Sequence, residues 1–386
     1  MTQGKTILIL GGGIGGVVAA SRLRQGLSSE HRVILVERET DHVFCPSFLW
    51  LMTGQRTAEE ISRPVAALAK HGIEVIRGNI DSINPEKRTI QVNGSEIAGD
   101  YLVIALGVDL APETVPGLVQ TGHNLYALAG AEALRDARLK VKQGRIAVLV
   151  SAMPFKCPAA PNEAAMLLEY DCRKRGIREQ IQIDLYTPEP GPMTTAGPET
   201  SAALRKMVEA KGIGYHPGHA VTKVDADARR LHFANGATAD FDLLAYIPPH
   251  RAPQVVRASG LCGEGDWIPV DRSTLETKFP GIVAIGDVAG IMLTSIGKPL
   301  PKAGVIAHNE AEVVAHNIIC AITGKGSPRR FGGDGACFIE TGDGRAGFGS
   351  ANFYAEPAPN MQLRSPGWLL HLGKIIYEKY WLYRWF

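Results

Sequence analysis

A glycine-rich segment near the N-terminus constrains the fold of this chain more than any other feature. Residues 11–16 read Gly-Gly-Gly-Ile-Gly-Gly and fit the pattern G-x-G-x-x-G. The motif glycines are Gly11, Gly13 and Gly16. The apolar run 6–10 before them is typical of a buried parallel strand, and a helical pattern follows them. A second apolar run ends at Glu37, about 20 residues further on, where an acid can bind a ribose hydroxyl. The segment therefore predicts a βαβ unit that binds a dinucleotide.

Two later segments indicate which dinucleotide this is. Residues 100–107, which end in Gly107, resemble the strand and turn where flavoprotein disulfide reductases leave their FAD domain. Residues 279–289 resemble the second FAD motif of these proteins, in which a carboxylate, here Asp287, accepts a hydrogen bond from the ribityl chain. The resemblance implies FAD as the cofactor and a split FAD domain, which we expect at residues 1–110 and 262–325.

The middle of the chain, residues 111–261, alternates strand and helix patterns and predicts a second parallel sheet. A second phosphate loop would stand between the strand at 145–150 and the helix that starts near 162. This loop instead contains Ser-Ala-Met-Pro-Phe-Lys-Cys-Pro, and side chains there would keep the backbone away from a pyrophosphate. We therefore expect a degenerate Rossmann-like domain that offers a thiol, Cys157, in place of a nicotinamide site.

The predicted fold class is α/β, with two Rossmann-like domains, the second degenerate, and a C-terminal region at 326–386 that contains an amphipathic helix. A formal net charge of +2 without a basic run argues against a nucleic-acid partner. Six cysteines without CxxC or His/Cys spacing predict no metal site. The N-terminal segment lacks the features of a secretory signal, and no apolar run approaches the ~20 residues that span a bilayer.

Several further segments resemble the sulfide:quinone oxidoreductases and the flavoprotein subunit of flavocytochrome c sulfide dehydrogenase. They run in the order of that family and lie at residues 154–161, 248–253, 267–271, 300–304 and 335–338. With the FAD motifs, the resemblance covers about residues 5–340. It implies an enzyme that oxidises sulfide to persulfide or polysulfide sulfur and passes the electrons through FAD to a membrane quinone.

Three cysteines are candidates for this chemistry. By resemblance, Cys157 and Cys337 correspond to the redox pair of the family. The position of Cys157 before a helix and beside Lys156 also favours a thiolate. Cys45 corresponds to a cysteine that carries a thioether to the flavin in the flavocytochrome branch, and both covalent attachment and an incidental or sulfur-handling thiol stay open. Cys172 is expected to be inert on a polar helix.

Two charged residues complete the predicted site. Lys302 precedes a long helix, and its ammonium would stabilise the negative charge of reduced flavin. The alternative is a solvent-exposed lysine. Glu163 lies in the first turn of the helix after Cys157, where it could take the proton of hydrosulfide or orient the incoming sulfur. An ordinary acidic residue at a helix N-terminus would occupy the same position.

The C-terminal tail, residues 368–386, is rich in aromatic residues and predicts a monotopic membrane helix. One helical face carries Leu369, Leu372, Ile376, Tyr380 and Tyr383, and the opposite face carries His371, Lys374 and Glu378. We expect the basic residues to meet lipid headgroups and the helix to serve the quinone side, apart from the sulfur chemistry. A helix packed on the protein or in a homo-oligomer is the alternative. The default location is the cytoplasmic membrane face, with the periplasmic face left open.

Three other functions are compatible with parts of this pattern. The same fold could pass electrons to a cytochrome c, although a lipid-like tail favours quinone. A type-II NADH:quinone dehydrogenase is disfavoured because the second glycine loop is absent. A non-catalytic, flavin-bearing membrane adaptor is disfavoured because both redox cysteines are present. Flavin spectra recorded with sulfide and with NADH would discriminate among these classes.

Overall fold

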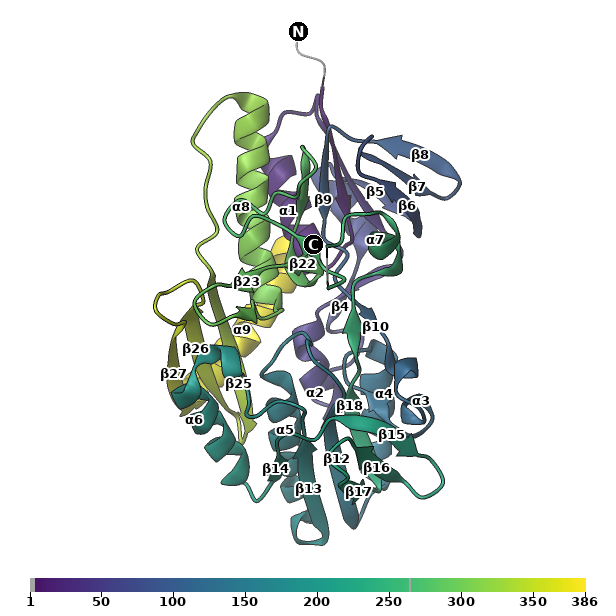
Figure 1. Cartoon of the computed structure of the whole chain (residues 1–386), viewed down its shortest axis with the longest axis vertical. Coiled ribbons are helices and arrows are strands. Elements are labelled where there is room, and N and C mark those ends of the chain that lie inside the picture. Colours follow the sequence, from purple (N-terminus) through teal and green to yellow (C-terminus); the bar gives the residue numbers. More distant parts are fainter. Residues whose placement is uncertain (1–3, 264) are drawn as a thin grey trace.

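Two α/β units lie one above the other in the computed structural model, which describes residues 4–263 and 265–386 (Figure 1). Residues 1–3, part of the segment compared above with a secretory signal, lie outside this description. The upper unit is built on a five-stranded sheet whose neighbouring strands are all parallel. Its order is β21 (Ile282–Ala284), β9 (Tyr101–Ile104), β1 (Thr6–Leu10), β2 (Arg32–Glu37) and β5 (Glu74–Arg77).

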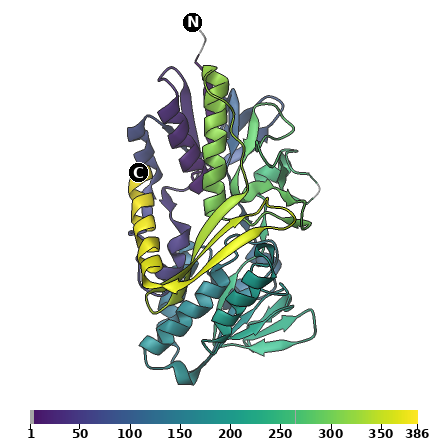
Figure 2. The same cartoon turned by 90° about the vertical axis from the view of Figure 1, so that its left-hand side faces the viewer.

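The strands of this sheet are apolar because both of their faces are covered. Residues 7–10 of β1 are fully buried, as are most residues of β2 and β9. Helices α1 (Ile14–Gly26) and α8 (Gly304–Thr323) lie side by side over one face (Figures 1 and 2). Their contact is close at Gly26, where a Cβ would lie 2.3 Å from Ile319.

The lower unit repeats this design with a second parallel sheet. Its order is β11 (His123–Asn124), β18 (Leu243–Ile247), β12 (Gly144–Val150), β13 (Ile181–Tyr186) and β14 (Gly214–His216). Its helices are α3 (Leu118–Thr121), α4 (Leu128–Lys140), α5 (Ala160–Lys174) and α6 (Pro198–Glu209). Two sheets of parallel strands covered by helices confirm the predicted α/β fold with two Rossmann-like domains.

Short elements surround the two parallel sheets. Antiparallel sheets are formed by β6 (Ile80–Asn84), β7 (Thr89–Val92) and β8 (Ser95–Ala98), and by β15 (Val221–Asp225), β16 (Arg230–Phe233) and β17 (Thr238–Asp240). Two-stranded pairs are β3 (Asp41–Val43) with β4 (Ser62–Pro64), β10 (Asp109–Leu110) with β19 (His250–Arg251), β20 (Ile268–Pro269) with β22 (Ala289–Gly290), and β23 (Met292–Leu293) with β24 (Lys298–Pro299). The short helices are α2 (Phe48–Met52) and α7 (Gln254–Ala258).

The C-terminal region bridges the two units. The antiparallel sheet of β25 (Asp334–Gly342), β26 (Arg345–Asn352) and β27 (Asn360–Gly367) contacts α5 of the lower unit and α8 of the upper unit through β25. Helix α9 (Trp368–Trp385) then runs back beside the upper unit, as Figure 2 shows in yellow. Trp381, Leu382 and Trp385 of α9 join the apolar core that contains α1 and α8. The tail is therefore an integral part of the fold.

Candidate active site

The glycine loop between β1 and α1 is shaped to receive a pyrophosphate. Gly11 has φ +101°, and a Cβ there would lie 2.5 Å from the Ala105 carbonyl oxygen. A Cβ at Gly16 would lie 1.8 Å from the Gly11 carbonyl oxygen, so only glycine permits this close turn. A Cβ at Gly13 would meet no protein atom within 4 Å. The open space at Gly13, at the N-terminus of α1, is where a phosphate group fits.

Glu37 ends β2 beside this loop, as the sequence predicts. Its carboxylate accepts hydrogen bonds from the backbone N–H groups of Gly12 and Glu39, the second at 2.9 Å. These bonds fix the carboxylate next to the loop. Recognition of a ribose hydroxyl by Glu37 stays a prediction.

The segments after β9 and β21 provide the other predicted FAD contacts. Gly107 has φ +65° and open space around its Cβ position. Asp287 lies on a short 3-10 helix, Gly286–Val288, and its Oδ1 atom is buried without a hydrogen-bond partner. An unsatisfied buried acceptor is costly, so this oxygen fits a donor supplied by a ligand, such as a ribityl hydroxyl. The residues present therefore fit FAD.

Lys302 is neither exposed nor free to move. Its ammonium donates to the carbonyl oxygens of Asp287 at 2.5 Å and Ala289 at 3.3 Å, and it lies 3.6 Å from the ring centroid of Trp267. Burial lowers the pKa of Lys302 to about 8, although Asp287 and Glu310 oppose this shift. The lysine therefore holds the Asp287 segment in place. Stabilisation of the negative charge of reduced flavin by Lys302 stays a prediction.

Cys157 is held in place by contacts to both units. It has φ +53°, an uncommon backbone conformation for a residue with a side chain. Its N–H donates to the Lys302 carbonyl oxygen at 2.7 Å, which joins the loop after β12 to the upper unit. The Tyr126 hydroxyl donates to the carbonyl oxygens of Lys156 at 2.6 Å and Cys157 at 3.1 Å. No motif in the sequence singles out Tyr126 for this role.

Cys337 lies on β25, opposite Gly349 of β26, and joins Cys157 in the apolar cluster of the lower unit. Both are free thiols. Burial raises the pKa of Cys157, and the Glu163 carboxylate and Cys337 add to this effect. Burial and Glu163 raise the pKa of Cys337 to about 12. The two cysteines chosen from the sequence thus lie within electrostatic range of each other.

The raised pKa values contradict the expectation that a helix N-terminus and Lys156 favour a Cys157 thiolate. Desolvation disfavours a charged thiolate more than these local effects can offset. The Lys156 ammonium lies 5.9 Å from the ring centroid of Tyr126, and its charge acts on Cys45 and His250. Lys374 is the lysine whose charge lowers the pKa of both Cys157 and Cys337.

Glu163 lies in a buried network of charged groups. The side chains of Glu163, Glu340 and Lys374 are 2%, 1% and 10% exposed. Glu163 Oε1 accepts from the Glu340 backbone N–H at 2.8 Å and from the Lys374 ammonium at 3.1 Å. Burial acts to lower the pKa of Lys374, but the Glu163 and Glu340 carboxylates outweigh it and raise that pKa. The network therefore places a stable ammonium beside the thiols.

Helix α9 exposes the predicted apolar face and buries the opposite face, which carries charged residues as far as Glu378 and then Trp381, Leu382 and Trp385. Leu369, Leu372, Ile376, Tyr380 and Tyr383 are all exposed, as the predicted amphipathic helix requires. Lys374 and Glu378 are buried, and Glu378 pairs with Arg56 at 2.8 Å and accepts from Ser47 Oγ at 2.7 Å. Assigning Lys374 to lipid headgroups was wrong, because the buried carboxylates of the protein need this cation. Among the helices of the described residues, none has the length and apolar character to cross a membrane.

The remaining cysteines differ in their surroundings. Cys45 begins a short 3-10 helix, Cys45–Ser47, and its thiol is exposed and subject to the charges of Lys156 and Asp287. It therefore lies near the predicted FAD contacts. Cys172, expected on a polar helix, is buried in the core of the lower unit because α5 is buried along most of its length, and its inertness stays a prediction.

Comparison with known proteins identifies the family. Residues 5–311 match the pyridine nucleotide-disulphide oxidoreductase family. The chain belongs to this family. With the glycine loop and the unsatisfied Asp287 oxygen, this membership establishes the chain as an FAD-binding flavoprotein oxidoreductase, as predicted.

Individual relatives cover almost the whole chain. The chain is 28% identical to the sulfide-quinone reductase of Aquifex aeolicus, over 98% of this chain and 91% of that protein. The crystal structure of the sulfide:quinone oxidoreductase from this bacterium matches with a TM-score of 0.89, over 99% of this chain and 91% of that chain, at 26% identity. The demethylphylloquinone reductase NdbB of Synechocystis is 31% identical, over 83% of this chain and 80% of that protein.

Proposed function

We propose that this family member oxidises sulfide to persulfide or polysulfide sulfur and passes the electrons through FAD to a membrane quinone. The observation that carries the proposal is the convergence of Cys157 and Cys337, from two different elements, in one half-buried apolar site next to the predicted FAD-binding segments. The relatives named for sulfide and quinone match the chain over nearly its full length, which supports the same assignment.

The cysteine pair carries the sulfur chemistry. When the pair is a disulfide, hydrosulfide attacks one sulfur, a new S–S bond forms and the Cys157–Cys337 bond breaks. The released cysteine takes the electron pair as a thiolate, and the other cysteine holds a persulfide. Bound FAD supplies a two-electron acceptor and relays the electrons to quinone. Overall, hydrosulfide, quinone and one proton give sulfane sulfur and quinol.

Charged side chains around the pair assist this step. The Lys374 ammonium offsets the negative charge of the released thiolate, because it already acts on both sulfurs. Glu163, which Lys374 holds at 3.1 Å, is the group that takes the proton of the persulfide. Tyr126 and Lys302 fix the backbone on either side of Cys157 and so position its sulfur.

We expect sulfide to reduce the flavin rapidly under anaerobic conditions, whereas NADH and NADPH leave it oxidised. The loop that follows β12 carries side chains where a second phosphate-binding loop would have glycines. A nicotinamide dinucleotide therefore has no site for its pyrophosphate there. Anaerobic absorbance spectra during titration with each donor measure this directly. Fast reduction by NADH without a response to sulfide would assign the chain to the NADH:quinone dehydrogenases instead.

We further propose that the exposed face of α9 binds the membrane and that quinone enters beside it. Its exposed apolar side chains include Tyr383 at 85% and Leu369 at 64%, and a large apolar patch of this kind marks an interaction surface. Phe338 follows the redox cysteine on β25 and approaches α9 at Gly373. The helix thus lies between the lipid surface and the sulfur site.

The double variant Ile376→Glu and Tyr383→Glu should abolish binding to liposomes while sulfide still reduces the flavin. Both side chains are exposed, so their replacement leaves the core intact. Each substitution removes an apolar side chain whose burial in the lipid contributes roughly 1.5–3 kcal/mol to binding, and it adds a charge that opposes burial. Liposome flotation measures the binding. Val119→Glu, which replaces an exposed apolar residue on α3, is the matched control and should float like the wild type. Unchanged flotation of the double variant would favour a homo-oligomer contact for this face.

We propose the division into residues 1–110 with 262–325, 111–261 and 326–386, because each three- or five-stranded sheet lies within one of these segments; among the strands of the described residues, only the short pair of β10 and β19 joins the first two. Attachment at the cytoplasmic face is likewise our working proposal. A cytochrome c is the alternative electron acceptor. The exposed apolar face of α9 favours a lipid-soluble quinone over a cytochrome.

A further inference from the structure

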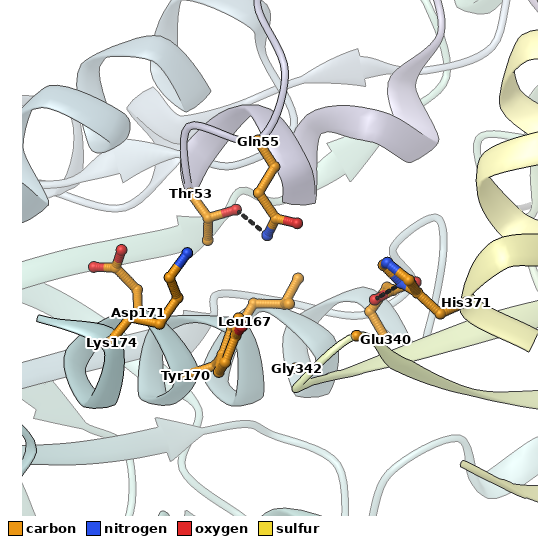
Figure 3. A pocket seen from close by; sticks show the side chains of 10 residues that line it. Thr53, Gln55, Leu167, Tyr170, Asp171, Lys174, Glu340, Gly342 and His371 are labelled. Atoms are coloured by element: carbon orange, nitrogen blue, oxygen red, sulfur yellow. Dashed lines mark hydrogen bonds and ion pairs between the residues drawn. The ribbon is translucent and has the colours of Figure 1, made fainter. Parts of the chain in front are cut away.

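A solvent-accessible pocket of about 200 Å³ lies behind the sulfur site (Figure 3). Its walls come from the segment after α2, from α5, from the β25–β26 turn and from α9. They consist of Thr53, Gln55, Leu167, Tyr170, Asp171, Lys174, Glu340, Gly342, Gly344 and His371. Gln55 and Lys174 at its rim are exposed to solvent. The mechanism proposed above does not use this pocket.

His371 and Glu340 form the inner end of the pocket. In Figure 3 the His371 ring points at the Glu340 carboxylate, and its Nδ1 atom lies 3.0 Å from both carboxylate oxygens. The Glu340 side chain is only 1% exposed, whereas the His371 side chain is 21% exposed. The pair therefore joins a buried acid to a side chain that reaches the pocket.

The same glutamate connects inward to the sulfur site. Its backbone N–H binds Glu163 Oε1 at 2.8 Å, and the Lys374 ammonium binds that oxygen at 3.1 Å. Lys374 also interacts electrostatically with the Glu340 carboxylate. Charges on Glu163 and Lys374 act on both Cys157 and Cys337. Titratable groups thus extend from the thiols to the pocket, and Glu163 and Glu340 within this series are linked by a backbone hydrogen bond and by the charge of Lys374.

We propose that Glu340 and His371 carry protons between the half-buried cysteines Cys157 and Cys337 and this pocket, with Glu163 as the group that first accepts them. The inference rests on the proposed function, because the oxidation of sulfide requires that a proton be released at the sulfur site. Hydrosulfide brings one proton, which leaves the sulfur as two electrons pass to the flavin, whereas the reduction of quinone elsewhere takes up two protons. The proton passes from the persulfide to Glu163, then to Glu340, and leaves through His371.

Lys374 allows this transfer without losing its charge. Its ammonium hydrogen-bonds Glu163 Oε1 at 3.1 Å and acts on the Glu340 carboxylate through its charge, so it stabilises the carboxylate at either end while the proton moves. The groups that face Glu340 are His371 and Lys374 of α9 and Glu163 of α5. Asp171, across the pocket, is already paired with Arg138 at 2.7 Å and Arg175 at 3.4 Å, and Lys174 stands beside it. These neighbours leave Glu340 and His371 as the path toward solvent.

The burial of Glu340 next to a half-buried histidine also affects its protonation. Burial raises the pKa of Glu340, against the lowering effects of Lys374 and His371. The glutamate is therefore suited to accept a proton nearer neutral pH than an ordinary carboxylate is. In the wild type we expect the rate of sulfide-dependent flavin reduction to rise with pH as Glu340 loses its proton, in addition to the ionisation of hydrogen sulfide itself.

The experiment compares Glu340→Gln and His371→Ala with the wild type as FAD-loaded, full-length proteins. We expect each variant to slow flavin reduction by sulfide roughly 10- to 100-fold in stopped-flow measurements. In Glu340→Gln the pH dependence attributed to this residue should disappear. In His371→Ala, added imidazole should enter the enlarged pocket and restore the rate. Lys174→Gln, which alters another residue of the pocket, should keep the wild-type rate and pH profile.

Three results would overturn the inference. The first is wild-type kinetics in both variants while sulfide still reduces the flavin. The second is a slow His371→Ala variant that imidazole does not rescue, together with a Glu340→Gln variant whose pH profile is unchanged, which would assign both residues a structural role. The third is a wild-type protein that sulfide does not reduce, which would remove the proposed function as well. Reduction by dithionite, expected to be equal in all proteins, verifies that the flavin itself is intact.

Discussion

Cys157→Ala and Cys337→Ala should each abolish reduction of the flavin by sulfide while FAD stays bound. Each variant leaves one thiol, which cannot form the disulfide that hydrosulfide attacks, so the loss should exceed about 100-fold. The FAD contacts predicted at the glycine loop and Asp287 involve neither sulfur. Stopped-flow absorbance with sulfide measures the reaction, and the flavin spectrum after gel filtration measures cofactor retention.

Cys172→Ala is the matched control for this pair. Cys172 lies on α5 and is buried, whereas Cys157 and Cys337 are half-buried, and it is outside the network of Glu163 and Lys374. We expect wild-type reduction by sulfide and at most a modest loss of stability from the removed sulfur. Full activity in Cys337→Ala would show that Cys157 works with a different partner.

The second large effect is expected for Lys374→Met. This variant leaves Glu163 and Glu340 buried without their shared cation, and breaking a buried pair on one side costs about 3–5 kcal/mol. The released thiolate also loses the positive charge that acts on it, so reduction by sulfide should fall together with stability. Thermal unfolding and stopped-flow reduction measure the two effects.

A double variant separates stability from chemistry. Glu163→Gln combined with Lys374→Met removes both charges and should recover much of the stability without restoring sulfide oxidation. Lys379→Met, on the same helix, should change neither property, because this half-exposed lysine lies 4.0 Å from Glu378, whose carboxylate Arg56 already pairs at 2.8 Å. Wild-type activity in Lys374→Met would contradict the role of this lysine at the thiols.

The contacts of α9 bear on the expectation that this helix serves quinone reduction alone. Its Lys374 bonds Glu163 and its His371 contacts Glu340, so we expect α9 to serve the sulfur chemistry as well. Removal of residues 368–386 should therefore impair both half-reactions, rather than quinone reduction alone.

The FAD-binding features could be predicted from the sequence because they are local. A strand, a glycine loop and a helix follow one another directly, so Gly11, Gly13 and Gly16 are visible as a pattern. Asp287 is recognisable for the same reason, since it follows its strand within a short motif. The α/β fold with two parallel sheets and the FAD cofactor are accordingly confirmed.

The environment of the thiols could not be predicted, because it depends on contacts between distant segments. Sequence neighbours suggested Lys156 as the cation near Cys157, whereas Lys374, far along the chain, has that place. Burial, which decides the pKa of both thiols, is likewise a property of the packed fold. No sequence motif includes Glu340 or Tyr126. For α9 the periodicity identified the two faces, but only the buried carboxylates explain why the polar face turns inward.

The charge balance of the buried network has a consequence for the redox pair. Two carboxylates and one ammonium already share a region from which water is largely excluded. A lasting thiolate at Cys157 or Cys337 would add another negative charge there, and an uncompensated buried charge is costly. Reduction of the pair should therefore be accompanied by proton uptake, and its midpoint potential should fall as the pH rises. In this sense the two sulfurs act as a carrier of hydrogen rather than of electrons alone.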